Sequence, residues 1–525
     1  MKLHWKILIW MAAGVLAGLC MQGFLAAPGW LGASLTDHED GGVRIESVVP
    51  GAPAAKAKLG AGDRVHAIIL NRGQEQREEI RWIHSASELE ETIEGLSQGT
   101  IVWLDVEGAT QPQVVSLAMK PGSPRDTWLE PFRFVAVIFM SLLKMLIIPL
   151  VLTSIITGVA GLGGGRDFGR LGGKTFLYYV STSLLAAALG LLLVNLIQPG
   201  VGAQLGLDPS QEFSAQDESL AGIFKRMVPQ NVFSAFSDNQ LMLQVIFFSL
   251  LFGYCITRVP ERERRLLTDF FSAAFKAMMK LAQLVLSLVP YGVFCLVIKV
   301  VAEAGISAFK PLALYMLMVF IGLLVHAGVT LPVILRLAGK VSPLRWVRAM
   351  SPALLTAFST SSSSATLPVT LESVEKRGGV SNKVTSFVLP LGATVNMDGT
   401  ALYECAGVLF LAQYYASAGG DPLTFQTQIK VVILALLASI GAAGIPSAGL
   451  VMMLAILSAL RLPIEGAALL LAIDRPLDMC RTVVNVWSDS CGTAVIASTE
   501  GEVLLQEEGI DPAVATEPSR GPPEG

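Results

Sequence analysis

Between Asp474 and Gly492 the sequence places charged and neutral polar residues at helical spacing. On a helix that turns about 100° per residue, one face carries Asp474, Asp478, Arg481, Thr482, Asn485 and Asp489. The opposite face is apolar, with Cys480, Val483, Val484 and Trp487. A guanidinium suits bidentate binding of a carboxylate, and carboxylate oxygens suit hard cations. Inside a membrane such groups normally face one another or a polar cavity.

Small and polar residues interrupt three apolar stretches elsewhere in the chain. The interruptions are Ser359–Thr366, Gly392–Thr400 and Ser439–Gly449, and the second contains Asp398. Irregular backbone at membrane depth is tolerated only where it is buried in protein or lines a water-filled cavity. Paired interruptions point to a transporter binding site. We therefore interpret the first and third stretches as re-entrant hairpins and the second as a broken helix.

The composition is that of a polytopic membrane protein. The chain has 525 residues, 52% hydrophobic and only 15% charged, with a mean hydropathy of +0.58, whereas soluble proteins have about 25% charged residues. The net charge of −4 gives no indication of nucleic-acid binding. The six cysteines form no CxxC or Cys/His cluster, so we interpret them as reduced packing residues.

Eight apolar segments are candidate spans. They are Ile7–Leu25, Pro131–Val159, Thr175–Ile197, Leu241–Ile256, Phe271–Val301, Leu312–Leu337, Ser386–Gln413 and Ala467–Ala497. Basic clusters at 166–174, 258–265, 336–348 and 376–383 fall on one side with Met1, which predicts that both termini are cytoplasmic. A cleaved signal peptide is the alternative for the first segment; we favour a retained helix.

A charged region lies between the first two spans. Residues 31–119 hold 14 acidic and 7 basic residues, and the β-type runs Val43–Val49, Arg64–Leu70, Ile101–Val106 and Gln113–Met119 surround a helix at Ser87–Leu96. The region resembles a PDZ domain at Trp30–Ala33, Val48–Ala54 and Leu59–Val65. The resemblance implies that Leu31, Gly32 and Ala33 bind a peptide carboxylate beside an added strand. A domain that only packs or spaces is the alternative.

The rest of the chain resembles the dicarboxylate/amino acid:cation symporters, the glutamate transporter family. The motifs are Asn396-Met397-Asp398-Gly399-Thr400 and Asp478…Arg481-Thr482…Asn485…Asp489. Transporters of this family are among the examples on which the association of paired interruptions with a binding site rests. The resemblance implies an all-α polytopic membrane protein with eight spanning helices, two re-entrant hairpins and an inserted small α/β PDZ-like domain. It also implies a homotrimer and an elevator mechanism that imports glutamate or aspartate with sodium, without enzymatic activity.

The resemblance assigns roles to individual residues. Arg481 would bind the side-chain carboxylate of the substrate, Asp478 its ammonium group, and Asn485 with Ser363 its α-carboxylate. Hydroxyl contacts would come from Thr400 and Thr482, and backbone contacts from Ser361, Ile445 and Gly449. Many members carry an additional arginine where this chain has Ser361 or Met479, and Arg475, paired with Asp474, is the expected replacement.

Three sodium sites and a proton carrier are also implied. The sodium ligands would be Asp489 with Gly392, Asn396 and Asn485; then Thr394, Ser439, Ile440 and Ala442; and finally Asp398 with Asn396, Tyr179, Thr182 and Ser183. Glu404 lies one helical turn after Thr400. Since burial favours the neutral form of a carboxyl group, we expect Glu404 to carry a cotransported proton.

These expectations divide the chain into five parts. They are a first transmembrane helix at 1–27, the PDZ-like extracytoplasmic domain at 28–122, further scaffold and transport-domain helices at 123–344, a transport core at 345–498, and a disordered cytoplasmic tail at 499–525. The expected location is the inner membrane of the cell.

Other functions fit the residues less well. A C4-dicarboxylate symporter is disfavoured because Asp478 would repel a substrate without an ammonium group. An intramembrane protease is disfavoured because no HExxH or GxSxG motif is present. A membrane sensor or scaffold that acts through the PDZ-like domain is the alternative from another class, and the complete set of polar residues argues against it.

Overall fold

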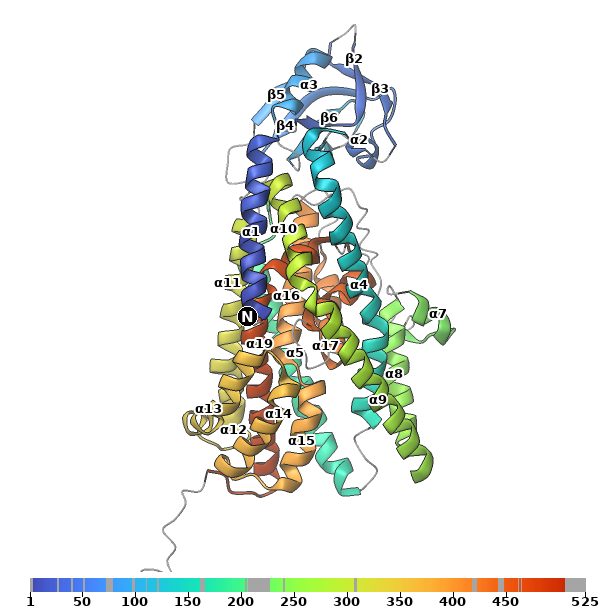
Figure 1. The fold of residues 1–525 in the computed structure, drawn as a ribbon. Helices are drawn as coiled ribbons and strands as arrows, with labels where there is room; N and C mark the ends of the chain where they lie inside the picture. Colours follow the sequence, from blue (N-terminus) through green and yellow to red (C-terminus); the bar gives the residue numbers. More distant parts are fainter. Residues whose placement is uncertain are drawn as a thin grey trace, which may run out of the picture.

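The computed structural model describes residues 3–25, 28–38, 41–50, 52–71, 79–96, 100–109, 111–119, 122–160, 166–203, 205, 227–238, 241–305, 309–417, 423–441, 448–460, 462–463 and 465–505. Figure 1 shows a bundle of long helices with a sheet-containing domain at one end. We call this part, residues 28–122, the inserted domain.

The inserted domain contains the strands of the fold. They are β1 Gly29–Trp30, β2 Ala33–Asp37, β3 Val43–Val48, β4 Arg64–Leu70, β5 Glu79–Trp82, β6 Ile101–Val106, β7 Gln113–Ser116 and β8 Ala118–Met119, with helices α2 Pro53–Lys56 and α3 Ala86–Glu94. The main antiparallel sheet has the order β2-β3-β4-β6-β7, with β5 on β4, and β1 pairs with β8. The predicted strands are confirmed, except that the last run is divided because β8 leaves the main sheet to pair with β1.

Eighteen helical segments follow or precede this domain among the described residues. They are α1 Leu3–Phe24, α4 Pro124–Ala160, α5 Arg166–Ile197, α7 Val232–Ser237, α8 Met242–Ile256, α9 Glu261–Ser287, α10 Val289–Ala304, α11 Phe309–Val325, η3 His326–Thr330, α12 Leu331–Leu337, α13 Pro343–Thr360, α14 Ser363–Glu372, η4 Ser373–Arg377, α15 Asn382–Val395, α16 Asp398–Ser417, α17 Phe425–Gly441, α18 Ala448–Ala459 and α19 Glu465–Thr499.

Length and apolar composition identify three described segments that can cross a membrane: Pro124–Ala160, Arg170–Ile197 and Phe309–Leu337. A fourth results if α9 and α10, which are bent by 48°, form one span. The predicted single span Phe271–Val301 is therefore interrupted. Pro290 lies in the first turn of α10, and proline cannot continue the hydrogen bonding of a preceding helix. The expected total of eight spans stays a prediction.

The interruptions predicted near the membrane centre are present where the structure describes them. Helix α13 ends at Thr360, Ser361 adopts the left-handed conformation with φ +51°, and Ser362 caps α14 by accepting a hydrogen bond from the Ala365 amide at 3.2 Å. Helices α15 and α16 are separated by Asn396 and Met397. The second hairpin has α17 and α18 as its arms, and its tip, residues 442–447, lies outside the described residues.

The first helix packs closely on a helix far along the chain. A Cβ atom on Gly14 would lie 3.2 Å from Val297 Cβ, and one on Gly18 would lie 2.6 Å from Val301 Cβ. Small residues four positions apart allow helix backbones to approach in a membrane. Arg125 of α4 joins the same helices, because its guanidinium donates to the carbonyl oxygens of Leu25, of Gln22 at 3.0 Å and of Ala302 at 3.1 Å.

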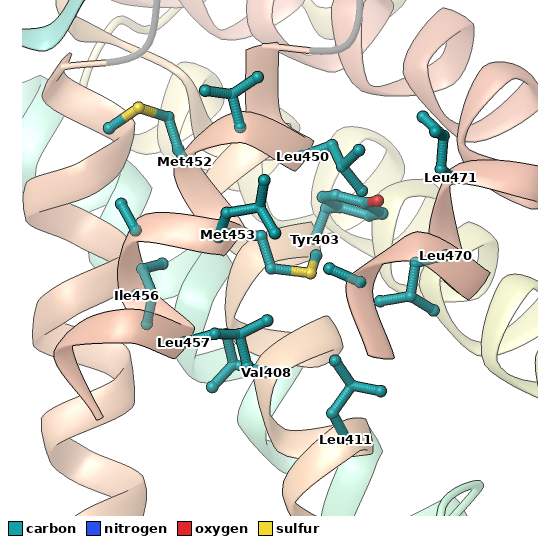
Figure 2. Packing of buried hydrophobic residues seen from close by; sticks show 14 of the residues in the cluster. Tyr403, Val408, Leu411, Leu450, Met452, Met453, Ile456, Leu457, Leu470 and Leu471 are labelled. Carbon is teal, nitrogen blue, oxygen red and sulfur yellow. The ribbon is translucent and has the colours of Figure 1, made fainter. Parts of the chain in front are cut away.

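One part of the largest buried apolar cluster lies between α16, α18 and α19. Figure 2 shows their apolar side chains packed together, with Tyr403 and Met453 at the centre. A Cβ atom on Gly407 would lie 2.3 Å from Met453 Cε, so the glycine leaves the space that Met453 fills. This packing fixes the position of Tyr403, whose ring lies under a charged side chain of α19.

Candidate functional site

Arg481 is almost completely buried on the predicted polar face. Its Nη2 donates to Asp478 Oδ1 at 2.8 Å and to Asp474 Oδ1 at 3.0 Å. Its guanidinium carbon lies 3.8 Å from the centre of the Tyr403 ring, within the range of a cation–π contact. Within the described part of the chain, Nε and Nη1 have no hydrogen-bond partner. Two donors of a buried guanidinium are thus available to an anionic group.

Arg475 does not form the ion pair with Asp474 that was expected for it. Its Nη1 donates to Asp478 Oδ2 at 3.1 Å, whereas Asp474 pairs with Arg481. Residues 475 and 478 are three apart on α19 and therefore share a helix face, but neighbours in sequence do not. Asp478 consequently lies between two guanidinium groups, and the expectation of an Arg475–Asp474 pair was wrong.

The broken helix contacts α19 through Asn485. Its Oδ1 accepts the Gly399 amide at 2.8 Å, and its Nδ2 donates to Thr400 Oγ1 at 3.3 Å. A Cβ atom on Gly449 would lie 2.6 Å from Arg481 Nη1 and 3.1 Å from Thr400 Cγ2. The start of α18 therefore closes the same space that Arg481 and Thr400 line. Thr482 donates within its own helix, to the Asp478 carbonyl at 2.8 Å.

The first hairpin places its predicted residues in the interior. Ser361 and Ser363 are buried, and the Ser361 hydroxyl has no partner among the described residues. Helices α13 and α14 both pack against α19. Neither serine forms a hydrogen bond with Arg481 in the described structure. The predicted residue Ile445 lies outside the described residues.

Asp398 lies at the centre of one predicted cation site. Its Oδ1 accepts hydrogen bonds from Ser183 Oγ at 2.6 Å and Thr182 Oγ1 at 3.2 Å, and Thr182 also contacts Asn396 Oδ1 at 3.4 Å. Tyr179 instead donates to the Val388 carbonyl at 2.8 Å. The two hydroxyl side chains, Asp398 and Asn396 are thus brought together, and Tyr179 lies at their edge.

Two partners of Asp398 were absent from the sequence prediction. His326 Nε2 lies 3.0 Å from Asp398 Oδ2, and Ser488 Oγ donates to the same oxygen at 2.6 Å. His326 is fully buried and begins the π-helical segment η3. An ionisable residue inside an apolar span is a signal of a functional site, and His326 in the predicted span Leu312–Leu337 carried that signal.

Asp489 forms a second cluster beside the first. Its Oδ1 accepts from Asn396 Nδ2 at 2.8 Å. A Cβ atom on Gly392 would lie 2.5 Å from this oxygen and 2.6 Å from Tyr179 OH. Only glycine leaves room there for both groups. The structure thus brings together Asp489, Asn396 and Gly392, as predicted, while Asn485 contacts Gly399 one helical turn away.

The remaining predicted cation ligands are backbone carbonyls. Thr394 is in the last turn of α15, and Ser439 and Ile440 are in the last turn of α17, where carbonyls lack partners within the helix. The two helices pack against each other. Ala442 lies outside the described residues. Over the described ranges, no group of three or more His, Cys, Asp or Glu side chains is arranged to hold a metal ion.

Glu404 lies on α16 and is fully buried. Neither carboxyl oxygen has a hydrogen-bond partner among the residues that the structure describes. A buried carboxyl group without partners is costly when charged. The surroundings therefore favour the neutral form expected of a proton carrier.

The predicted peptide loop lies at the edge of the inserted domain. Gly32 has φ +77°, and a Cβ atom there would lie 2.1 Å from Ala52 Cβ. Leu31 is buried, and Ala33 begins β2, which stands at the end of the sheet order. Helix α3 packs near β2, where the Ala86 amide donates to Asp37 Oδ1 at 2.6 Å. An edge strand thus runs beside a helix.

Comparisons with known proteins find a family model and several relatives that match most of the chain. The profile of the sodium:dicarboxylate symporter family matches residues 115–499. Excitatory amino acid transporter 3 of Oryctolagus cuniculus is 36% identical over 427 residues, covering 71% of this chain and 80% of the relative. The proton/glutamate-aspartate symporter of Escherichia coli is 34% identical over 373 residues, covering 69% and 84%. The proton/sodium-glutamate symport protein of Geobacillus stearothermophilus is 33% identical over 392 residues, covering 73% and 90%.

Proposed function

The chain belongs to the sodium:dicarboxylate symporter family, and from this membership we propose that it imports acidic amino acids together with sodium ions. The observation that carries the proposal is the buried guanidinium of Arg481, which keeps two donors without partners in the described structure. The names of the relatives, which specify glutamate and aspartate with protons or sodium, support the same substrate class.

The substrate is held by opposite charges at its two ends. Arg481 binds the side-chain carboxylate through the donors that Asp474 and Asp478 leave available, and Thr400 and Thr482 add hydroxyl contacts. Asp478 binds the ammonium group. Asn485 and Ser363 bind the α-carboxylate, a role supported by the position of Ser363 at the amino end of α14, where the helix dipole favours an anion. Ser361, Ile445 and Gly449 contribute backbone groups.

Sodium ions bind next to the substrate and neutralise the acidic residues of the site. The clusters around Asp398 and Asp489 supply carboxylate, amide, hydroxyl and carbonyl oxygens, which suit a hard cation. His326 and Ser488 orient Asp398 from the side opposite Ser183. The third site uses the carbonyls of Thr394, Ser439, Ile440 and Ala442. Glu404 carries a proton with the same substrate.

Uptake by the purified protein in proteoliposomes tests this function. An inward sodium gradient should drive accumulation of labelled glutamate or aspartate, and an excess of unlabelled aspartate should compete better than succinate. Full uptake in sodium-free medium under a pH gradient alone would contradict sodium coupling. Equal competition by succinate would favour the C4-dicarboxylate alternative, and no uptake of either class would favour a sensor or scaffold.

The inserted domain has a function of its own in this proposal. It is a PDZ-like domain outside the cytoplasm whose groove, between β2 and α3, binds a peptide carboxylate at Leu31, Gly32 and Ala33. The position of β2 at the edge of the described sheet and the positive φ of Gly32 support this role. The family also implies eight spans, a homotrimer, cytoplasmic termini and an elevator movement of the hairpins with α15, α16 and α19.

A further inference from the structure

Strand β5 presents an apolar face that nothing in the described structure covers. Ile80 and Trp82 are 53% and 63% exposed, and since they are two residues apart, they lie on the same face of the strand. The other face carries Glu79 and Arg81, whose side chains form an ion pair at 2.8 Å. The strand is thus amphipathic, and its apolar side is as exposed as its charged side.

This face continues a buried apolar cluster. Ile80 is paired with Ile69 of β4, and Ile69 packs with Ile101 and Trp103 on the same side of the sheet. Ile80 and Trp82 therefore extend a packed surface, and their exposure is not that of isolated side chains at a loop tip.

The connections hold the domain close to the ends of two membrane helices. Only residues 25–28 separate α1 from β1, and residues 120–123 separate β8 from α4; four residues span at most about 14 Å. Met119 of β8 packs directly with Leu129 of α4 and Ile298 of α10. The base of the domain therefore rests on the helix ends.

Exposed aromatic residues mark the membrane boundary at this end. Phe24 of α1 is 87% exposed and Trp128 of α4 is 63% exposed, and the exposed apolar side of α4 continues with Phe134 and Val137. Tryptophan is enriched at the membrane–water interface, whose polar part is about 5–7 Å thick on each side of the hydrocarbon. In Figure 1, β5 lies at the level just beyond the end of α1, where this layer begins.

From this geometry we infer that the lipid bilayer is the partner of β5, with Ile80 and Trp82 inserted into the headgroup region of the nearest leaflet. Residues 31–119 carry 14 acidic and 7 basic residues, so attraction to anionic lipid does not supply the contact. The contact is apolar and aromatic, and salt should not release it.

Tryptophan quenching in phosphatidylcholine vesicles tests the contact with the full-length protein. The Trp82 signal is the difference in fluorescence between the unmodified protein and Trp82→Phe. The matched control is Trp103→Phe, because Trp103 lies in the same sheet but is only 7% exposed. Lipids brominated close to the headgroup should remove the larger part of the Trp82 signal and leave the Trp103 signal unchanged. Both results should be the same without added salt and at about 0.5 M salt, which screens charge attraction.

Two results would overturn the inference. Quenching of Trp82 by aqueous iodide but not by brominated lipid would show that the face is surrounded by water. Protection from both quenchers would show that protein covers it, for example a second copy of the chain. Because the Trp82 side chain is largely exposed, its replacement by phenylalanine removes no core packing.

Discussion

Arg481 is held between two carboxylates and an aromatic ring, so its removal has a specific consequence. Truncation of one partner of a buried charge pair costs about 2–5 kcal/mol. We therefore expect Arg481→Ala to lower uptake of acidic amino acids roughly 30-fold or more, while small neutral amino acids are still transported. Competition assays in proteoliposomes measure both classes.

Asp478→Ser is the complementary control. It removes the group that binds the ammonium and should shift preference toward dicarboxylates, although Arg475 and Arg481 both lose a partner. An Arg481→Ala protein that transports aspartate as well as the unmodified protein would show that this arginine does not bind substrate.

The proposed role of Glu404 as proton carrier can be tested by a substitution that cannot ionise. Glu404→Gln keeps the size of the side chain and fixes it in a neutral state. Exchange of internal for external substrate should remain, and the effect of external pH on net uptake should disappear. A pH-sensitive dye inside the vesicles measures the accompanying proton flux. Unchanged pH dependence in the Gln protein would reduce Glu404 to a packed acid.

The polar face of α19 was predictable because its residues share one helix, where spacing determines direction. Two partners of Asp398, His326 and Ser488, were not predicted, since they come from segments that only the fold brings together, whereas Ser183 was expected from the family resemblance. The Arg475–Asp474 error has a similar origin, because sequence adjacency on a helix separates side chains by about 100°.

At the scale of elements, Gly392 is where α15 meets α5 and α19. We expect Gly392→Ala to displace Asp489 or Tyr179, because the added methyl would lie 2.5 and 2.6 Å from their oxygens. Both the melting temperature and the apparent affinity for sodium should fall. Gly173→Ala in α5 is the control, because a Cβ atom there has no neighbour within 4 Å and alanine favours a helix by about 0.5–1 kcal/mol. Normal sodium dependence in Gly392→Ala would remove this glycine from the cation site.

The segment after α19 is tied to the end of α5. Glu500 accepts from Lys174 Nζ at 2.6 Å and also pairs with Arg170. The hydrogen bond from Lys174, with both positive charges, lowers the pKa of Glu500. A carboxyl group whose pKa is lowered by folding stabilises the protein above its unfolded pKa and loses that contribution as the pH falls through its folded pKa.

We therefore expect Glu500→Gln to lower the melting temperature at pH 7 slightly. The loss in free energy of unfolding should be the small amount typical of exposed ion pairs, under about 1 kcal/mol. The difference from the unmodified protein should shrink as the pH falls below the usual glutamate pKa of about 4.3 and vanish only below the lowered pKa of Glu500 in the folded protein. Thermal unfolding in detergent at several pH values measures it. A difference that persists at the lowest pH would assign the effect to packing of the segment.

Which elements could be predicted depended on pattern length. The runs Arg64–Leu70 and Ile101–Val106 became β4 and β6 with the same bounds, because a short apolar run rich in β-branched residues is typical of a largely buried strand. Strand β5 was missed because its run is only four residues long and all four residues are exposed. The bend between α9 and α10 was missed because hydropathy is continuous across it, although Pro290 marked it.

For the whole molecule, we predict that transport does not require the inserted domain. Arg125 bonds to the Leu25 carbonyl, so the chain ends on either side of the domain lie within reach of one side chain. Replacement of Trp30–Pro121 by a short linker should leave sodium-driven uptake measurable in proteoliposomes. Absence of uptake from a deletion protein that is folded, as judged by its melting transition, would make the domain part of the transport machinery.

The contacts of Arg125 also constrain the order of assembly during synthesis. Helix α1 is made first, yet the carbonyls at its end are capped from residue 125, and its packing surface at Gly14 and Gly18 meets residues 297 and 301. The ribosome must add nearly 280 further residues before that surface is covered. Until then the surface of α1 at Gly14 and Gly18 lacks its partner from α10. A translocation chaperone that shields single helices would therefore meet this protein early and be released only when α10 arrives.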